Sequence, residues 1–304
     1  MEFTPDQIVV STGAKQSIAN VVLCLINPGD EVIVPAPYWV SYPEMVKLAG
    51  GVPKTVFAGI ESGFKITPEQ LRAAITPKTR MVIINSPSNP TGAVYTRAEL
   101  EALVAICVQA NVWIMSDEIY ENLVYDGQTT CSPATFSPEA ARLTITVSGY
   151  AKSYSMTGWR LGWGLWPDNL VRDAERMQIN SASCASAPVQ VAAIEALRGP
   201  QDAVDVMLKA FDERRHIITE ELNSVPGFSC ILPKGAFYAF PNIKATGLGS
   251  KQLEEKLLHE AGVAVLAGNS FGHLGEGYLR FSYASSVDEI RSAVGRVRDL
   301  MSKS

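Results

Sequence analysis

The sequence predicts an α/β protein with a larger part built on a mostly parallel sheet flanked by helices, and a smaller C-terminal α+β part. Through the first two thirds of the chain, short apolar runs rich in β-branched residues alternate with helical patterns. The last third changes to a long, charged amphipathic pattern followed by shorter strands and helices. We therefore expect a large domain at residues 1–205 and a small domain at residues 206–304.

The elements of the first part follow from their apolar patterns. The clearest helix is predicted over 97–109, where apolar residues recur on one face. Thr96 is its expected N-cap, and Glu99 stands three residues further on, as a capping box requires. Four nearly all-apolar runs have the character of strands buried on both faces, namely 31–34, 81–84, 112–115 and 143–147.

The second part begins with an amphipathic helix over 201–223 that links the two domains. Shorter elements follow it, because the apolar runs become brief and Pro and Gly interrupt them. We expect strands at 228–231, 236–240, 263–266 and 278–281, and helices at 250–261 and 287–302.

Composition excludes several classes of protein. The 304 residues include 26 Lys plus Arg and 31 Asp plus Glu, which gives a net charge of −5, and 47% of the residues are hydrophobic. An acidic balance disfavours nucleic-acid and anionic-membrane partners, and no apolar run reaches the roughly 18 residues of a membrane span. The five cysteines are scattered without a CxxC pair. This favours reduced thiols in the cytoplasm, and the missing ligand spacing argues against a metal site.

A lysine follows the last predicted strand of the large domain. Lys152 lies among small and aromatic residues, in the run from Gly149 to Gly162, and Arg160 follows eight positions later. A lysine buried past a strand has a lowered pKa, which makes its amine a nucleophile toward carbonyl groups. The alternative is an exposed loop lysine, the fate of most lysines.

Three other segments stand at the ends of predicted strands or the start of a helix. Asp117 ends the strand 112–115, where open α/β sheets bind ligands, although an Asp followed by Glu can also be a helix N-cap. The segment 85–92 contains Asn89-Pro90-Thr91-Gly92 and could be a plain turn. Gly13-Ala14-Lys15 opens the first helix, where free N–H groups suit a phosphate.

Together these segments resemble the class I aminotransferases, fold-type-I enzymes that depend on pyridoxal 5′-phosphate. The resemblance covers essentially the whole chain, and the Lys152 segment is its most specific part. The stretch from Tyr38 to Met45 is most similar to bacterial aspartate aminotransferases of the Ib subgroup. The matching segments occur in the family's order, and they include Pro37-Tyr38-Trp39, Asp117-Glu118-Ile119-Tyr120, Gly235-Ala236-Phe237-Tyr238 and Arg280 within Tyr278-Leu279-Arg280-Phe281-Ser282.

The resemblance implies a role for each cofactor-binding residue. Lys152 forms the Schiff base with the cofactor and moves the proton during the reaction. Asp117 pairs with the pyridine nitrogen, while Tyr120 and Asn89 bond the ring's phenolic oxygen. Trp39 stacks on the ring, unless it is an ordinary core aromatic. The phosphate is bound by the N–H groups of Gly13, Ala14 and Lys15 together with Arg160.

The substrates implied are an L-amino acid, aspartate or glutamate, and a 2-oxo acid. Arg280 holds the α-carboxylate as a bidentate pair, with Trp39 and Asn89 beside it, and the alternative for Arg280 is an ordinary surface arginine. Lys15 either binds the distal carboxylate or merely flanks the phosphate. These residues predict a transaminase without a metal, working as a cytoplasmic homodimer.

The sequence also departs from the family pattern. Relatives carry roughly another quarter of a chain before the segment matching Met1, and that part holds an N-terminal arm and a loop over the substrate. This leaves an inactive truncated form as one alternative. Another is a different reaction on the same fold, such as an aromatic or alanine aminotransferase, β-lyase, decarboxylase or synthase. A ligand-sensing half of a transcription regulator is a third alternative, which the acidic charge disfavours.

Overall fold

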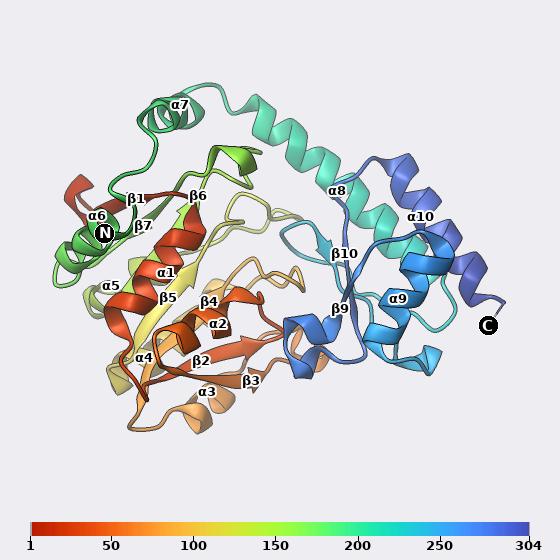
Figure 1. Ribbon diagram of the computed structural model, residues 1–304, viewed down its shortest axis with the longest axis horizontal. Coiled ribbons are helices and arrows are strands. Elements are labelled where there is room, and N and C mark those ends of the chain that lie inside the picture. Colours follow the sequence, from red (N-terminus) through yellow and green to blue (C-terminus); the bar gives the residue numbers. More distant parts are fainter. Residues whose placement is uncertain (1, 304) are drawn as a thin grey trace.

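The computed structural model describes residues 2–303 and contains two sheets (Figure 1). The larger sheet has seven strands in the order β1-β7-β6-β5-β4-β2-β3. Strands β2 to β6 pair in parallel, and β7 runs antiparallel to both β6 and β1. The predicted mostly parallel sheet is therefore confirmed. Its strands are β1 (Ile8–Ser11), β2 (Glu31–Ala36), β3 (Val52–Phe57), β4 (Thr79–Asn85), β5 (Trp113–Asp117), β6 (Thr144–Gly149) and β7 (Gly162–Leu165).

Helices cover both faces of this sheet. Alternate residues of β2 point to opposite faces, so Val32 and Val34 pack in one core and Ile33 in the other. The first core is shared with α1 (Ala14–Leu25), α2 (Ser41–Leu48) and α6 (Val171–Ala182). The second core is shared with α3 (Pro68–Ala74), α4 (Arg97–Ala110) and α5 (Pro138–Leu143). Burial on both faces explains why the central strands β2, β4, β5 and β6 are largely apolar. The edge strand β3 is only partly buried and contains Lys54 and Thr55, and the sequence did not predict it.

Helix α4 begins where the sequence predicts. The Thr96 hydroxyl accepts a hydrogen bond from the Glu99 N–H at 3.3 Å, and the Glu99 carboxylate accepts one from the Thr96 N–H at 2.8 Å. This reciprocal pair satisfies two N–H groups that the first turn of a helix leaves without a partner. The helix ends at Asn111, whose left-handed backbone (φ 51°) stops it.

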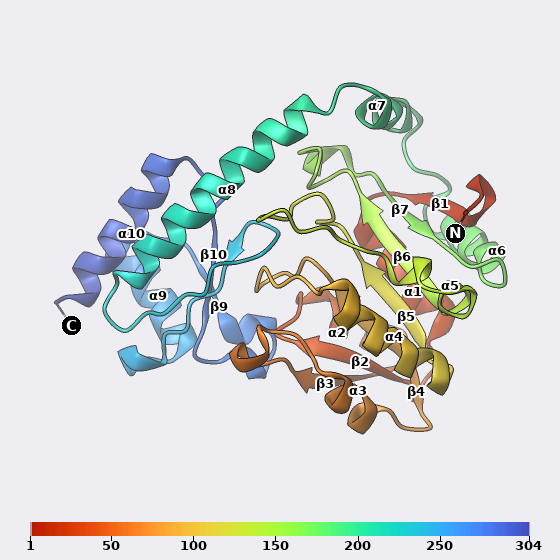
Figure 2. The same ribbon diagram turned by 180° about the vertical axis from the view of Figure 1, so that it is seen from behind.

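The smaller sheet has the order β8-β10-β9 and is antiparallel (Figure 2). The predicted strand at 228–231 is wrong, because only Ser229 forms an isolated bridge, with Asn242. The strand predicted at 236–240 is only two residues long, and the strand predicted at 263–266 is displaced, since it shares only Leu266 with the observed one. The helices and the last strand lie within one residue of their predicted bounds. These elements follow one another along the chain. They are α8 (Asp202–Asn223), β8 (Tyr238–Ala239), α9 (Ser250–Ala261), β9 (Leu266–Ala267), β10 (Leu279–Ser282) and α10 (Val287–Met301), and α7 (Ala187–Arg198) precedes them.

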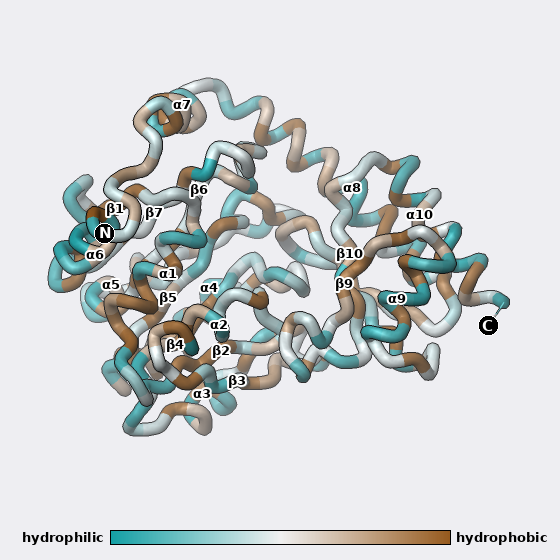
Figure 3. Tube along the Cα trace, in the orientation of Figure 1, coloured by the Kyte–Doolittle hydropathy of each residue, from teal (hydrophilic) through white to brown (hydrophobic). Residues whose placement is uncertain are grey.

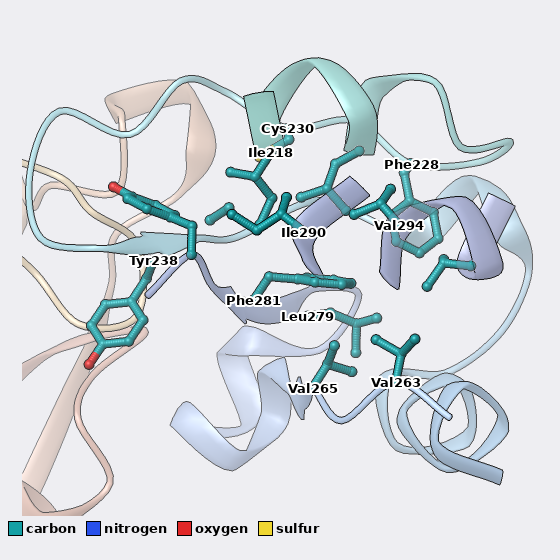
Figure 4. Packing of buried hydrophobic residues seen from close by; sticks show 14 of the residues in the cluster. Ile218, Phe228, Cys230, Tyr238, Val263, Val265, Leu279, Phe281, Ile290 and Val294 are labelled. Atoms are coloured by element: carbon teal, nitrogen blue, oxygen red, sulfur yellow. The ribbon is translucent and has the colours of Figure 1, made fainter. Parts of the chain in front are cut away.

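Helix α8 connects the two sheets and alternates hydrophobic with hydrophilic positions along its length (Figure 1, Figure 3). Its Ile218 and Leu222 pack with β10 and α10 into a third core, on the smaller sheet, which Figure 4 shows from close by. The expected boundary at residues 205 and 206 falls in the first turn of this helix, and the division into two domains stays a prediction. Among the described residues, no helix combines the length and apolar character that crossing a bilayer needs.

Candidate active site

A cavity of about 340 Å³ opens where the carboxyl ends of β4, β5 and β6 meet the smaller sheet. Its walls come from segments far apart in the sequence, from the start of α1 to β10. Most of the predicted site residues line it, and Gly13 lies just outside. The lining includes Ala14, Lys15, Trp39, Asn89, Asp117, Tyr120, Lys152, Arg160 and Arg280, and also Tyr42, Asn85, Thr157 and Tyr238.

Asp117 ends β5 and is buried at the base of the cavity. The Tyr42 hydroxyl donates a hydrogen bond to its carboxylate at 2.6 Å, and the Ile119 N–H donates another at 3.2 Å. Burial raises the pKa of Asp117 to about 6, while the Tyr42 bond and the charge of Lys152 oppose that rise. The sequence alone assigned Tyr42 no role. Two features of the sequence could have pointed to Tyr42. It follows Trp39 by about one helical turn, and a buried carboxylate needs hydrogen-bond donors.

Lys152 follows β6, half-buried among aromatic rings. Its Nζ lies 5.3 Å from the ring centroid of Phe237 and 5.8 Å from that of Tyr120. Burial lowers the pKa of the amine, and the charges of Arg280 and Arg160 lower it further, with Asp117 acting in the opposite direction. These surroundings make it easier for the amine to lose its proton, and a neutral amine can act as a nucleophile or accept a proton.

One end of the cavity is shaped to receive an anion. Gly13 precedes α1 with φ +82°, and a Cβ built on it would lie 2.5 Å from the Arg160 guanidinium. A Cβ on Gly162 would lie only 2.2 Å from the backbone nitrogen of Ala14. Position 162 therefore requires glycine because the Ala14 backbone lies so close, and position 13 requires it because of the positive φ, since the Arg160 side chain could move away. The first N–H groups of the helix and the Arg160 cation together suit a phosphate.

Arg280, on β10, lies at the wall of the cavity that the smaller sheet forms. One of its terminal nitrogens donates to the Asn89 side-chain oxygen at 2.9 Å. Its guanidinium carbon lies 4.5 Å from the Tyr238 ring centroid and 4.8 Å from that of Phe271. Its Nε is buried without a hydrogen-bond partner among the described residues. A buried, unpaired N–H is costly, and a ligand carboxylate would satisfy it.

The remaining predicted residues complete the walls. The Lys15 amine lies 4.9 Å from the Trp39 ring centroid, and Trp39 meets the Tyr42 ring edge-on at 5.3 Å. The Tyr120 and Tyr238 hydroxyls are 2.9 Å apart. Burial raises the pKa of Tyr120 well above its usual value, and the adjacent Tyr238 raises it further, so Tyr120 stays protonated. The sequence placed Tyr238 in a matching segment without giving it a role.

A second cluster of potential ligands lies in the small-domain half. Ligand atoms of Asp126, Asp212 and His216 lie within 4.8 Å of one another. The Arg215 guanidinium already hydrogen-bonds both carboxylates and lies 3.2 Å from the His216 ring nitrogen. The cluster is therefore an ion-pair network around a buried arginine rather than an open set of metal ligands.

The arrangement in the cavity fits pyridoxal 5′-phosphate. The glycine-shaped end would hold the phosphate, the buried Asp117 carboxylate would pair with the ring nitrogen, and the half-buried Lys152 amine would supply a nucleophile for the carbonyl group. The unpaired Arg280 Nε leaves a donor for the carboxylate of an amino acid at the opposite wall.

Comparison with known proteins agrees with this geometry. The family model for aminotransferase class I and II matches residues 1–297. An aspartate/prephenate aminotransferase of Cereibacter sphaeroides is 47% identical over 98% of this chain and 77% of its own length. An aspartate aminotransferase of Geobacillus stearothermophilus is 46% identical over 99% of this chain and 77% of its own length.

Solved structures show the same fold. The aspartate aminotransferase of Rhizobium meliloti superposes with a TM-score of 0.95 at 38% identity, over 99% of this chain and 78% of that one. The aromatic aminotransferase of Pyrococcus horikoshii also gives 0.95, at 39% identity, over 97% of this chain and 79% of that one. The chain thus belongs to the class I and II aminotransferases, enzymes that depend on pyridoxal 5′-phosphate.

Proposed function

We propose that this aminotransferase takes its amino group from a dicarboxylic L-amino acid, aspartate or glutamate, and passes it to a 2-oxo acid. The observation that carries the proposal is the pair of cationic groups in one cavity: the unpaired edge of Arg280 at one wall and the Lys15 amine at another. Two cations suit a substrate with two carboxylates. The relatives named for aspartate support this choice.

The large-domain residues hold and tune the cofactor. When bound, pyridoxal 5′-phosphate supplies the electron sink that stabilises negative charge at the substrate α-carbon. Asp117 would hold a proton on the ring nitrogen, since its buried carboxylate favours a cationic partner. Tyr120 and Asn89 would bond the phenolic oxygen, and Trp39 would stack on the ring.

The phosphate would be held by groups at the start of α1. The N–H groups of Ala14 and Lys15 lie in the first turn of α1, where the helix dipole favours an anion. The Gly13 N–H, in contrast, already donates to the Ser11 carbonyl at 2.8 Å and is not available to the phosphate. Arg160 supplies the matching charge, fixed by its own bond to the Thr157 carbonyl at 2.8 Å. The cofactor would therefore be anchored at its phosphate, away from the reacting carbon.

Lys152 would attach the cofactor and then move the proton. Its amine has a lowered pKa and lines the same cavity as Asp117 and Arg280. A neutral amine there can take a proton from the substrate α-carbon and return it to another atom. Arg280 would orient the substrate through its α-carboxylate, while Lys15 would bind the distal carboxylate.

We also propose that two copies pair and that the protein works in the cytoplasm. Helix α7 exposes Val191, Ile194 and Leu197, beside an apolar groove of about 380 Å³ that includes Ile8. An apolar surface of this kind favours a protein interface. The five cysteines are free, as in a reducing compartment. Sedimentation velocity of the wild-type protein and Ile194→Glu tests pairing, and cell fractionation tests the location.

The first experiment is an absorption spectrum of the 304-residue chain with pyridoxal 5′-phosphate. We expect a visible band that moves to the ultraviolet with L-aspartate and returns with 2-oxoglutarate. If the band does not change with aspartate but changes with an aromatic amino acid or alanine, that amino acid is the substrate instead. The absence of any band would show that this chain does not hold the cofactor by itself.

A further inference from the structure

We propose that Tyr238 is a positioning residue of this site, because its ring turns the Arg280 guanidinium edge-on to the cavity for a carboxylate. The proposal rests on the proposed function in one respect, the carboxylate-binding role of Arg280. Tyr238 lies at the edge of the small-domain core (Figure 4), and it also lines the cavity. It therefore belongs to both regions at once.

The Arg280 guanidinium packs against two aromatic rings. Its central carbon is 4.5 Å from the Tyr238 ring centroid and 4.8 Å from that of Phe271. A planar cation is attracted to ring faces and loses little hydration there. Because the two rings already contact the cation, its N–H groups are what remains to bind a ligand. The Asn89 oxygen takes one of these donors, and Nε is unpaired among the described residues.

Tyr238 is itself held at both ends. Its hydroxyl lies 2.9 Å from the Tyr120 hydroxyl, and its backbone pairs with Ser282 in the β8–β10 ladder. Since Arg280 also lies on β10, the ladder fixes the ring relative to the guanidinium. The ring is therefore a fixed support rather than an adaptable neighbour.

The turn before Tyr238 adds to this rigidity. Ala236 is buried and has a left-handed backbone (φ +57°), which a residue with a Cβ adopts only when its surroundings require it. The Tyr125 and Tyr283 hydroxyls both donate to its carbonyl, and its N–H donates to the Leu123 carbonyl at 2.8 Å. These bonds hold the strained turn that directs Phe237 and Tyr238 toward the cavity.

The test uses succinate, a dicarboxylate without an amino group, and cofactor-free protein in inorganic phosphate buffer. Calorimetry gives the succinate Kd for the wild type, Tyr238→Leu, Tyr238→Phe and Arg280→Lys. We expect Tyr238→Leu to weaken binding about 5- to 10-fold through loss of the ring, and Tyr238→Phe to change it less than about 2-fold. Phe228→Leu, which removes another ring of the same core, is the matched control and should bind as the wild type does.

A double-mutant cycle separates positioning from general loss of structure. If Tyr238 acts through Arg280, adding Tyr238→Leu to Arg280→Lys should weaken succinate binding less than about 2-fold. A full effect in that background, or no succinate binding by the wild type, would overturn the proposal. In the cofactor-loaded enzyme we expect Tyr238→Leu to raise the KM for L-aspartate by the same factor, with kcat within about 2-fold. Failure of the loaded wild type to turn over would contradict the proposed function alone, since the succinate cycle would still decide the role of Tyr238.

Discussion

Two arginines of the smaller part, the buried Arg215 and the half-buried Arg280, have opposite surroundings. Arg215 forms a bidentate pair with Asp126, at 2.7 and 3.0 Å, and also bonds Asp212 and the Pro233 carbonyl. Arg280 bonds only the neutral Asn89 oxygen, and its Nε is unpaired among the described residues. Breaking a buried ion pair leaves a charge without its partner and destabilises the fold, whereas a cation with an unpaired donor is available to a ligand. The contrast predicts which substitutions change activity and which change stability.

The largest effect is expected at Lys152. Like Arg280 it lines the cavity, and burial disfavours its positive charge. Lys152→Ala removes the amine that holds the cofactor and moves the proton, so turnover should fall by at least about 10³-fold. Steady-state rates with L-aspartate and 2-oxoglutarate measure this. Its melting temperature should stay near that of the wild type, and near-normal turnover would remove Lys152 from the mechanism.

Arg280→Lys tests the unpaired arginine directly. A lysine keeps the charge but cannot present two parallel donors, so the KM for the amino acid should rise about 10- to 100-fold. The global stability should change little, because no bond to a carboxylate of the protein is lost. An unchanged KM would show that another group holds the α-carboxylate.

Arg215→Met tests the paired arginine in the opposite sense. It leaves two carboxylates without their main partner, and since both are partly exposed the free energy of unfolding should fall by about 2–3 kcal/mol. The KM should stay within about threefold of the wild type. Urea denaturation and initial rates measure the two quantities, and a rise in KM as large as that of Arg280→Lys would abolish the distinction.

The ion pair between Arg215 and Asp126 should also make the stability of the protein depend on pH. Hydrogen bonds from Arg215 and Lys234 hold the pKa of Asp126 well below its usual range. A lowered folded-state pKa contributes stability above the unfolded pKa of about 4, and this contribution is lost as the pH falls through more acidic values. We therefore expect the wild type to lose stability between about pH 4 and pH 2 more steeply than Arg215→Met. Parallel acid-denaturation curves would contradict the pairing.

The smallest effect concerns Tyr42, which supplies the bond that a buried carboxylate needs. Tyr42→Phe removes the hydroxyl that lowers the pKa of Asp117, so this pKa should rise above about 6. Binding of pyridoxal 5′-phosphate to the cofactor-free protein should then fail at a pH about half to one unit higher than in the wild type. Tyr278→Phe, which removes a buried hydroxyl outside the cavity, is the control. Identical pH profiles would mean that Tyr42 does not tune Asp117.

The four central strands of the larger sheet, β2, β4, β5 and β6, could be predicted from the sequence because they are buried on both faces and largely apolar. The strands β1, β3 and β7 were not predicted, because they are only partly buried and lack a long continuous apolar run. The smaller sheet could be placed only loosely, since β8 and β9 are two residues long and depend on their pairing with β10. The segment 228–231 has the composition of a strand, but only Ser229 finds a bridging partner. Tertiary pairing therefore outweighs local propensity in this part.

The candidate site, too, could be predicted from the sequence only in part. Residues within recognisable segments, such as Lys152, could be proposed from the sequence. The roles of Tyr42 and Tyr238 depend on contacts with residues 75 and 118 positions away, which no local pattern reveals. The pairing of the Arg215 cluster with Asp126 was likewise hidden, because the two lie 89 positions apart.

The bond between Arg280 and Asn89 joins positions 191 residues apart, and this separation has a consequence for how the protein is made. Synthesis proceeds from the N-terminus, so all seven strands of the larger sheet leave the ribosome before β10 does. The groups proposed to hold the phosphate and the ring nitrogen can therefore assemble first. The wall that contains Arg280 forms last, because its contact with Asn89 has to bring together residues separated by the longest stretch of chain in the site. A nascent chain would thus acquire the means to hold its cofactor before it could choose an amino acid.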